Sequence, residues 1–303
     1  MIVAMNRAEL LNTSLVCIAL SASSTICLVV FILWFDGTQH RWSIFNSQLL
    51  AMSTVSIALF ATTYIEIDSD SLELAYQMAW AVGAALSGLW VIAFSRHSWK
   101  RSQQVIRQRY KKKEKIFRRI IEYLPYLAVL QALPSIMQAT LNDVDPSLPA
   151  LYQRLIYIAA IALPLLTLIV MLVLDGFFLL VFIQHISTFS QELSVEKRDS
   201  SFNLVARFGI AACVINITGV FILGISFMFS VEDWVGWLLS LVSNGCVHAA
   251  FLCLFGLKVA LYLEKEKEMK LGNDLRLASA LHSVKGDEIR VSSASGQVET
   301  RKG

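Results

Sequence analysis

Two ionisable side chains lie deep inside apolar stretches of this sequence and are the first candidates for chemistry. Asp175 stands in the sequence Leu174-Asp175-Gly176, and His248 lies near the middle of the last apolar stretch. Ionisable groups in such surroundings are costly and mark functional hypotheses by default. Two such groups on different segments make neither a proton relay nor a metal site. We expect His248 to make an interhelical hydrogen bond or to line a pocket, and Asp175 to pair with Arg207.

The sequence lacks the residue patterns that many enzymes and metal sites need. It contains no HExxH, GxSxG or Walker-type glycine motif, each of which holds reactive or phosphate-binding groups at fixed spacing. The cysteines all fall in apolar stretches, without the CxxC and histidine spacing of a zinc site; they are Cys17, Cys27, Cys213, Cys246 and Cys253. We therefore expect a protein that is not an enzyme and that holds no metal and no cofactor.

The composition places these side chains in a membrane. The 303 residues are 56% hydrophobic and only 16% charged, whereas soluble domains are about 45–50% apolar and about 25% charged. The excess lies in long uncharged runs, which are typical of membrane spans. This composition excludes a secreted enzyme, a disulfide scaffold and a nucleic-acid-binding domain, and it makes the lipid bilayer the first partner of the chain.

Seven apolar stretches are long enough to cross a bilayer as helices, which needs about 20 residues each. They cover residues 10–35, 43–65, 74–94, 120–141, 151–183, 202–229 and 234–263. Lipid cannot satisfy open backbone groups, so regular helix is the expected structure. The predicted fold is an all-α, seven-transmembrane-helix bundle, followed at residues 264–303 by a cytoplasmic tail that is helical at first and then disordered.

Charge between the spans predicts the orientation. The segment between the third and fourth spans carries ten lysine and arginine residues against Glu114 alone, while acidic residues follow the second, fourth and sixth spans. Lysine and arginine in short connections stay on the cytoplasmic side. We therefore expect the N-terminus outside, the C-terminus in the cytoplasm, and a multi-pass protein of the plasma membrane.

Small residues in the third span predict that this helix is central in the bundle. Gly83 and Ser87, and likewise Ala84 and Gly88, stand four residues apart. Such pairs let helix backbones approach closely in a membrane. Trp90, on the same span, lies deep enough to line a pocket or to pack in the core.

The seven spans, the outside N-terminus, the short connections and the long fifth span together resemble a G-protein-coupled receptor. Ser95-Arg96-His97 ends the third span where rhodopsin-class receptors carry an acidic residue, arginine and an aromatic residue, and only Arg96 matches. Pro134 and Pro164 lie in the fourth and fifth spans, as prolines often do in that class. The sixth span has no proline, and the seventh has no NPxxY motif.

The resemblance implies a ligand cavity open to the outside and a coupling face on the cytoplasmic side. Candidates for the ligand pocket are Gln77, Trp80, Gln138, Arg154, Tyr157, Trp237, Asn244 and His248. Candidates for coupling are Arg96, Lys100, Arg101, Lys111, Lys112 and Lys113. The implied partner is a heterotrimeric G protein or another cytoplasmic effector. The basic segment is equally suited to anionic lipids of the inner leaflet.

Two other classes of function stay open. A transporter or channel for a small molecule or ion is disfavoured by the scarcity of buried charges and by the absence of paired, broken helices. A membrane scaffold without a ligand would need none of these features. The sequence favours a receptor-like protein that passes an extracellular or lipid-borne signal to the cytoplasm.

The predicted orientation can be tested directly. A reporter fused between Lys100 and Arg119 is expected to give a cytoplasmic signal, because the positive charges hold this segment inside. The same reporter after residue 303 is the matched control for the cytoplasmic side. An extracellular signal from the reporter between Lys100 and Arg119 would contradict the orientation.

Overall fold

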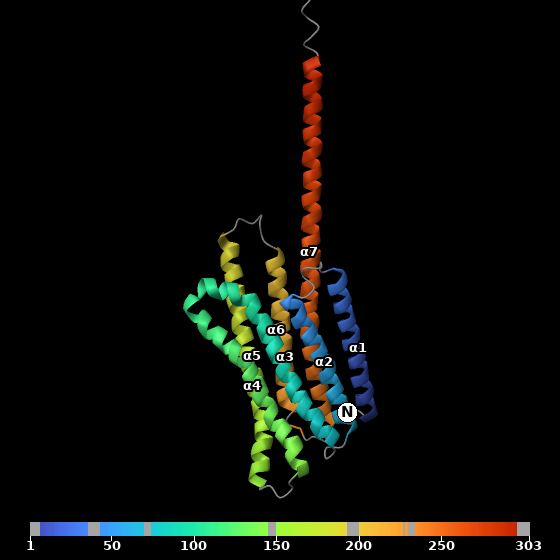
Figure 1. The fold of residues 1–303 in the computed structure, drawn as a ribbon, viewed down its shortest axis with the longest axis vertical. Helices are drawn as coiled ribbons and strands as arrows, with labels where there is room; N and C mark the ends of the chain where they lie inside the picture. Colours follow the sequence, from blue (N-terminus) through green and yellow to red (C-terminus); the bar gives the residue numbers. More distant parts are fainter. Residues whose placement is uncertain are drawn as a thin grey trace, which may run out of the picture. The chain divides into compact units, whose positions relative to one another are not determined.

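The computed structural model describes residues 7–35, 43–69, 74–144, 150–192, 200–226, 228–229 and 234–295. Within these ranges the chain forms seven α-helices and no strand. Figure 1 labels them in chain order: α1 (Arg7–Trp34), α2 (Ile44–Asp68), α3 (Leu74–Arg109), α4 (Lys111–Val144), α5 (Ala150–Glu192), α6 (Ser200–Ser226) and α7 (Trp234–Ser295). Each contains a stretch long and apolar enough to cross a membrane. The all-α, seven-helix membrane bundle is thus confirmed.

The chain divides into two compact units, residues 1–256 and residues 257–303. The first holds α1 to α6 and the beginning of α7. In the second, α7 continues to Ser295, and Lys270 forms an ion pair with Glu266, one helical turn away, at 2.8 Å. The hydrogen bond to Glu266 raises the pKa of Lys270. The sequence predicts disorder from about residue 283, whereas α7 is helical to Ser295; residues 296–303 lie outside the described residues.

The basic segment between the third and fourth spans is helical rather than an open loop. Helix α3 continues to Arg109 and α4 begins at Lys111, so only Tyr110 separates them. The backbone N–H of Tyr110 donates to Ile106 at 2.8 Å, and that of Glu114 donates to Tyr110 at 3.1 Å. Residues 99–119 contain no glycine or proline, and lysine, arginine and glutamine are good helix formers.

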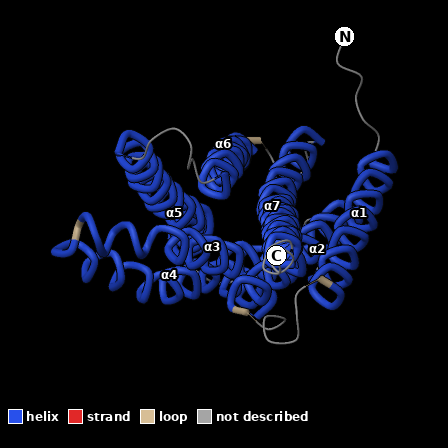
Figure 2. The backbone as a smooth tube through the Cα atoms, turned by 90° about the horizontal axis from the view of Figure 1, so that it is seen from above, coloured by secondary structure: helices blue, strands red, loops and turns tan. Residues whose placement is uncertain are grey.

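Helix α3 is central among the helices of the first unit. It packs against α2, α4 and α5, as the view along the bundle in Figure 2 shows. Gly88 explains the close approach to α4, because a Cβ atom there would lie 2.8 Å from Nε2 of Gln131 and 3.0 Å from the carbonyl oxygen of Ala128. Gly88 therefore allows the close approach that the sequence predicted, whereas a Cβ atom at Gly83 would meet its nearest neighbour, Thr62 Oγ1, only at 3.6 Å, an ordinary contact.

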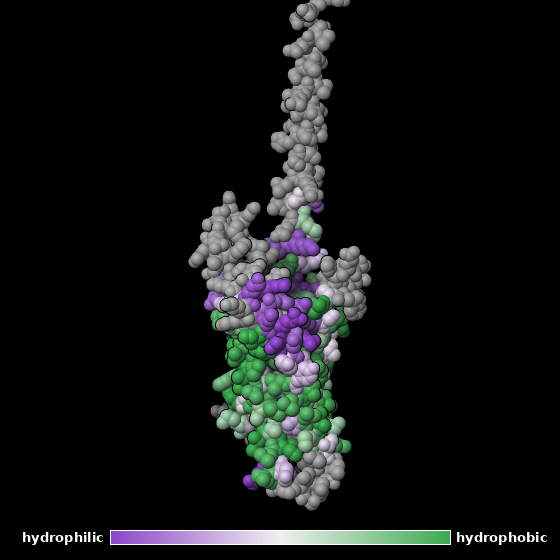
Figure 3. Space-filling model, turned by 60° about the vertical axis from the view of Figure 1, so that its left-hand side comes forward, coloured by the Kyte–Doolittle hydropathy of each residue, from purple (hydrophilic) through white to green (hydrophobic). Residues whose placement is uncertain are grey.

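The core of the first unit draws on every helix. Buried apolar side chains from α1 to α7 form one cluster, which includes Leu28, Met52, Phe94, Leu124, Met171, Ala212 and Phe251. A smaller cluster joins the ends of α3 and α4 to α5 around Trp99 and Phe178, whose ring centroids lie 5.6 Å apart. Large apolar side chains such as Leu20, Val173 and Phe221 are exposed on the outside. Figure 3 shows a broad hydrophobic surface on one face of the molecule, of the kind that a bilayer covers.

Gly219 offers a sharp test of the packing between α6 and α7. A Cβ atom at Gly219 would lie 2.8 Å from Cβ of Cys246, whereas one at Gly224 on the same helix meets nothing within 4 Å. We expect Gly219→Ala to lower the free energy of unfolding by about 1–3 kcal/mol through overpacking. Unfolding of the purified protein in bicelles measures this change.

Gly224→Ala is the matched control and is expected to be neutral or slightly stabilising, because alanine is the better helix former. Cys246→Gly removes the clashing atom and should restore part of the stability lost in Gly219→Ala. Equal stability of the two alanine variants would show that α6 and α7 do not meet at Gly219.

Candidate functional site

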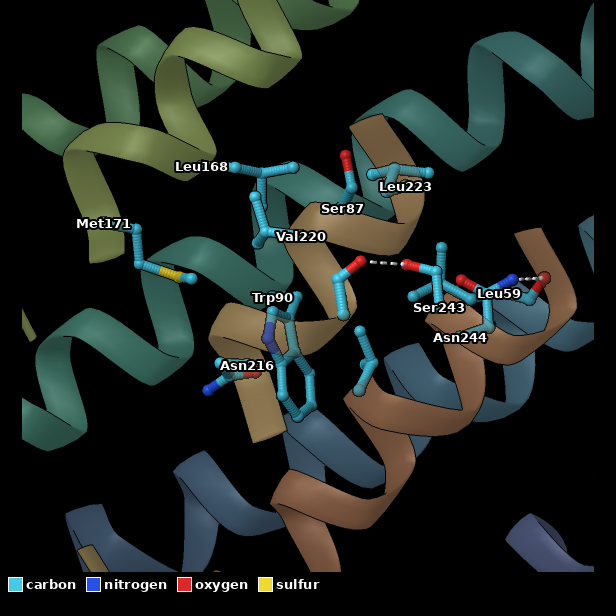
Figure 4. A pocket seen from close by; sticks show the side chains of 12 residues that line it. Leu59, Ser87, Trp90, Leu168, Met171, Asn216, Val220, Leu223, Ser243 and Asn244 are labelled. Carbon is cyan, nitrogen blue, oxygen red and sulfur yellow. Dashed lines mark hydrogen bonds between the residues drawn. The ribbon is translucent and has the colours of Figure 1, made fainter. Parts of the chain in front are cut away.

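A cavity of about 50 Å³ lies inside the first unit, between α2, α3, α5, α6 and α7 (Figure 4). Its walls are mainly apolar and include Leu59, Trp90, Leu168, Met171, Val220 and Leu223. Four polar side chains also line it, namely Ser87, Asn216, Ser243 and Asn244, and no lining residue is ionisable. Apolar walls with a few polar groups are typical of small-molecule sites.

Two of the polar groups tie α7 to its neighbours. The Ser243 hydroxyl donates to the backbone oxygen of Gly219 on α6 at 3.0 Å, and Asn244 Nδ2 donates to Thr63 Oγ1 on α2 at 2.9 Å. Figure 4 draws the Ser243 bond as a dashed line, and its second dashed line joins Asn244 to Leu59. Asn244 Nδ2 also lies 3.4 Å from the Leu59 carbonyl oxygen, so its donors point to α2. These bonds fix the α7 side of the cavity.

Ser87 is held on the α3 side. Its hydroxyl donates to the Ala84 carbonyl oxygen at 2.8 Å and accepts from Gln131 Nε2 on α4 at 3.2 Å. The same Nε2 donates to the Ala84 oxygen at 3.0 Å. Gln131 is itself buried, so the pair brings α3 and α4 together through hydrogen bonds inside the bundle.

Asn216 differs from the other polar groups of the cavity. Its side chain on α6 is 4% exposed, and its Nδ2 has no hydrogen-bond partner among the residues that the structure describes. A buried donor without an acceptor costs about 1–3 kcal/mol. The Asn216 carboxamide lies beside the ring of Trp90 in Figure 4, and its unpaired nitrogen is buried in the protein.

His248 lies in a separate polar cluster formed by α1, α2 and α7. Its Nδ1 is 3.0 Å from Ser56 Oγ and 3.3 Å from Ser21 Oγ, and its Nε2 is 3.4 Å from Ser24 Oγ. Ser21 and Ser56 are buried. Both ring nitrogens thus meet hydroxyl groups, which can donate or accept as the tautomer requires. The expected interhelical hydrogen bond is present.

Asp175 is 2% exposed and accepts a hydrogen bond from the Ser98 hydroxyl of α3. This bond ties α5 to α3 beside the Trp99 and Phe178 cluster. Arg207, its expected partner, is exposed on α6. The pairing of Asp175 with Arg207 stays a prediction.

The predicted pocket residues do not gather in this cavity. Asn244 lines it, whereas His248 belongs to the serine cluster. Arg154 and Tyr157 are exposed near the beginning of α5. The other candidates on described side chains, Gln77, Trp80 and Trp237, are partly buried elsewhere on α3 and α7, and the side chain of Gln138 lies outside the described part.

The junction of α3 and α4 exposes the predicted coupling residues. Arg96, Lys100 and Lys111 are exposed, as are Arg107, Lys115, Arg118 and Arg119. The structure does not describe the side chains of Arg101, Lys112 and Lys113. Two acidic residues lie among these cations: Glu114 is 3.9 Å from Arg107, and Glu122 is 2.9 Å from Arg118. Cations outnumber the anions, and Figure 3 shows a hydrophilic patch above the apolar surface.

Sequence reasoning missed Ser87, Asn216 and Ser243 as cavity residues. Asn216 was visible as a carboxamide in the middle of an apolar span, which is a signal in its own right because polar groups there are costly. Serine carries no such signal, since its hydroxyl can bond to a carbonyl of its own helix. Trp90 was recognised as deep, and the structure places it on the cavity wall.

Among the residues that the structure describes, no group of three or more His, Cys, Asp or Glu side chains lies close enough to hold a metal ion. Comparison of the chain with protein-family models, with curated proteins and with solved structures gives no match. The site is therefore interpreted from its own geometry.

The serine cluster gives a measurable coupling between helices. We expect His248→Leu and Ser56→Ala each to destabilise the bundle, with a coupling of about 0.6 kcal/mol between them in a double-mutant cycle, the average for polar pairs between membrane helices. The free energy of unfolding in bicelles is the measurement. Thr54→Val is the matched control, because the Thr54 hydroxyl is exposed and donates within α2 to Leu50.

Strictly additive effects of His248→Leu and Ser56→Ala would show that these two side chains do not interact. Coupling of equal size between His248→Leu and Thr54→Val would show that the effect is not specific to the cluster.

Proposed function

We propose that this chain is a ligand-binding, receptor-like membrane protein that passes a signal to a cytoplasmic partner. The observation that carries the proposal is the cavity between five helices, whose mainly apolar wall carries four polar side chains. A ligand in this position contacts α3, α5, α6 and α7 at once, so its binding energy depends on how these helices are arranged.

The mechanism is a shift between two arrangements of the helices. A ligand changes an equilibrium only by its difference in affinity for the two states. Asn216 on α6 and Trp90 on α3 both line the cavity, so a state that brings these two helices around the ligand is favoured by the contacts that it adds. Ser243 joins α7 to α6 through the Gly219 oxygen, which couples α7 to the same shift.

Helix α3 links the cavity to the proposed coupling face. Trp90 lines the cavity and Lys100 is exposed ten residues further along the same helix, a distance of about 15 Å at 1.5 Å per residue. A rotation or shift of α3 therefore moves the basic junction with α4. In this proposal the junction binds a heterotrimeric G protein or another cytoplasmic effector.

The same junction is proposed to contact anionic lipids of the inner leaflet. Each lysine or arginine near such a surface contributes about 1 kcal/mol of attraction. Exposed Ile116, Tyr123 and Tyr126 on α4 lie next to these cations in the chain, and tyrosine is enriched at membrane interfaces. Lipid contact and effector binding are compatible, because both use positive charge on the cytoplasmic side.

A proton transporter is the second candidate, and the serine cluster around His248 is the observation that favours it. A histidine whose two nitrogens both meet hydroxyl groups can take up and release a proton while keeping hydrogen bonds in every protonation state. Ionisable groups inside a membrane often belong to proton pathways. The cavity beside Asn216 would have no part in this function.

Nucleotide exchange on a panel of Gα subunits tests the receptor proposal. We expect the full-length protein in nanodiscs to stimulate exchange on at least one subunit. Arg96→Ala, or glutamine at Lys111, Lys112 and Lys113 together, should remove most of that stimulation, because they reduce the charge of the coupling face. Lys270→Gln is the matched control: it neutralises an exposed lysine far along α7 and should change nothing.

Two results would contradict the receptor proposal. One is equal exchange by the wild type and by both coupling variants. The other is the absence of exchange together with proton flux in liposomes that His248→Leu abolishes, which would favour the transporter instead. Repeating the exchange assay with and without phosphatidylserine in the nanodisc tests the lipid contact.

A further inference from the structure

We propose that the chain binds a primary ammonium group at Glu66, near the end of α2 that faces the beginning of α3. The residues of this site are not among those that line the cavity, so the inference stands apart from the receptor proposal. It follows from a carboxylate that no described cation pairs with, from a second oxygen that lies beside the same point of α3, and from the aromatic residues around them.

Glu66 is a partly buried carboxylate two residues before the end of α2. Among the described residues it forms no hydrogen bond and no ion pair. An ionisable group within a span is a functional hypothesis by default, and a charge taken out of water needs a partner. The partner that compensates a carboxylate is a cation.

The described cations of the first unit do not supply that partner. The guanidinium of Arg7 donates to backbone oxygens at the end of α2 and not to the Glu66 side chain. Arg154, exposed on α5, forms no ion pair with Glu66 either. The basic junction with α4 lies about 40 Å further along α3 than Gly83, at 1.5 Å per residue. The cation therefore comes from outside the described part of the chain.

Two oxygen atoms of α2 lie beside Gly83 of α3. Thr62 Oγ1 is 3.6 Å and Glu66 Oε1 is 3.7 Å from the position that a Cβ atom would take at Gly83. The Thr62 hydroxyl donates to the Leu59 carbonyl oxygen at 2.9 Å, which leaves its lone pairs able to accept. A carboxylate oxygen and a hydroxyl oxygen near one point suit an ammonium group, because it carries several N–H donors and no acceptor.

Aromatic side chains surround this point. The charge of Glu66 acts on the hydroxyl of Tyr76 on α3, as does the hydroxyl of Tyr157 on α5. Tyr76, Trp80 and Gly83 are spaced by four and three residues, so they share the face of α3 that meets α2. Aromatic rings attract ammonium groups, whereas the described residues offer no cluster of metal ligands. These surroundings favour an organic ammonium over a metal ion.

Propylammonium and 1-propanol separate the effect of charge from ordinary contact. They have the same number of heavy atoms, and only the first is positively charged at neutral pH. Their dissociation constants are measured by saturation-transfer NMR on the full-length protein in dodecyl maltoside, a detergent without charge, with protein-free micelles subtracted. We expect saturable propylammonium binding that is about tenfold or more tighter than propanol binding, the range that hydrogen bonds to a charged group supply.

Glu66→Gln removes the negative charge at the same volume and is expected to bring the ratio of the two constants to about one. Asp68→Asn is the matched control, because it neutralises an exposed acid two residues further along the chain. That variant should keep the wild-type ratio. The wild-type ratio is itself decisive, so the test holds even where Glu66→Gln does not fold.

Gly83→Ala tests whether the two oxygens act together. The added methyl group meets no atom closer than 3.6 Å, so the protein should fold, yet the group takes the space beside both oxygens. We expect propylammonium binding to weaken about threefold or more, as when a hydrogen bond is lost. Gly224→Ala on α6, where a Cβ atom also meets nothing within 4 Å, should bind as the wild type does.

Four outcomes would overturn the inference: equal binding of propylammonium and propanol by the wild type, an unchanged ratio in a folded Glu66→Gln protein, an equal loss of the ratio in Asp68→Asn, or displacement of propylammonium by an equal concentration of sodium chloride. The last would mean that the site takes any small cation. Because these constants are measured without a G protein, the receptor proposal and this inference fail independently.

The ammonium group has two possible sources, a soluble amine and a lipid head group. Phosphatidylcholine nanodiscs with and without phosphatidylethanolamine separate them. Weaker propylammonium binding in the presence of phosphatidylethanolamine would show that the lipid head group competes for Glu66. Unchanged binding would show that the ligand is a soluble amine.

Discussion

The hydrocarbon of a bilayer offers no hydrogen-bond partner, and this constraint governs how the polar side chains of the chain are placed. Each donor or acceptor within a span must find a partner inside the protein or pay a desolvation cost. Three of the buried polar groups meet it across helix boundaries: Asn244 with Thr63, Gln131 with Ser87, and His248 with serines of α1 and α2. The same groups that would be unstable in lipid thereby specify which helices lie together.

Apolar packing alone would specify less, because lipid is as apolar as leucine and provides little driving force between helices. In this bundle, close approach of helix backbones and hydrogen bonds between helices together specify which helices pack against each other. Gly88 lets α4 approach α3 closely at the point where Gln131 forms its hydrogen bonds. In the same way, Gly219 lets α7 approach α6 closely at the point where Ser243 forms its hydrogen bond. At each point a small residue on one helix and a polar residue on its partner act together. The cavity lies between these two contacts, with Ser87 from one and Ser243 from the other on its wall.

The sequence predicts the helices well and the cavity poorly, for a physical reason. A run of about 20 apolar residues has one stable solution in a membrane, so the seven helices follow from composition and length. Which side chains face a cavity depends on how five helices are rotated relative to one another. No single stretch of sequence determines these rotations. Asn244 was nominated from its depth and does line the cavity, while Asn216, also within a span, was not nominated although it lines the same cavity. The sequence analysis also did not predict that residues 99–119 are helical, because a high density of charged residues indicates contact with water but does not indicate a backbone conformation.

The single residue between α3 and α4 also bears on how the bundle holds together. With only Tyr110 between them and extensive packing along their length, the two helices form one helical hairpin. The bonds of Gln131 to Ala84 and Ser87 lie within this hairpin, so the polar group is satisfied there without any other helix. The polar contact that borders the cavity on the α3 side is therefore independent of α5, α6 and α7.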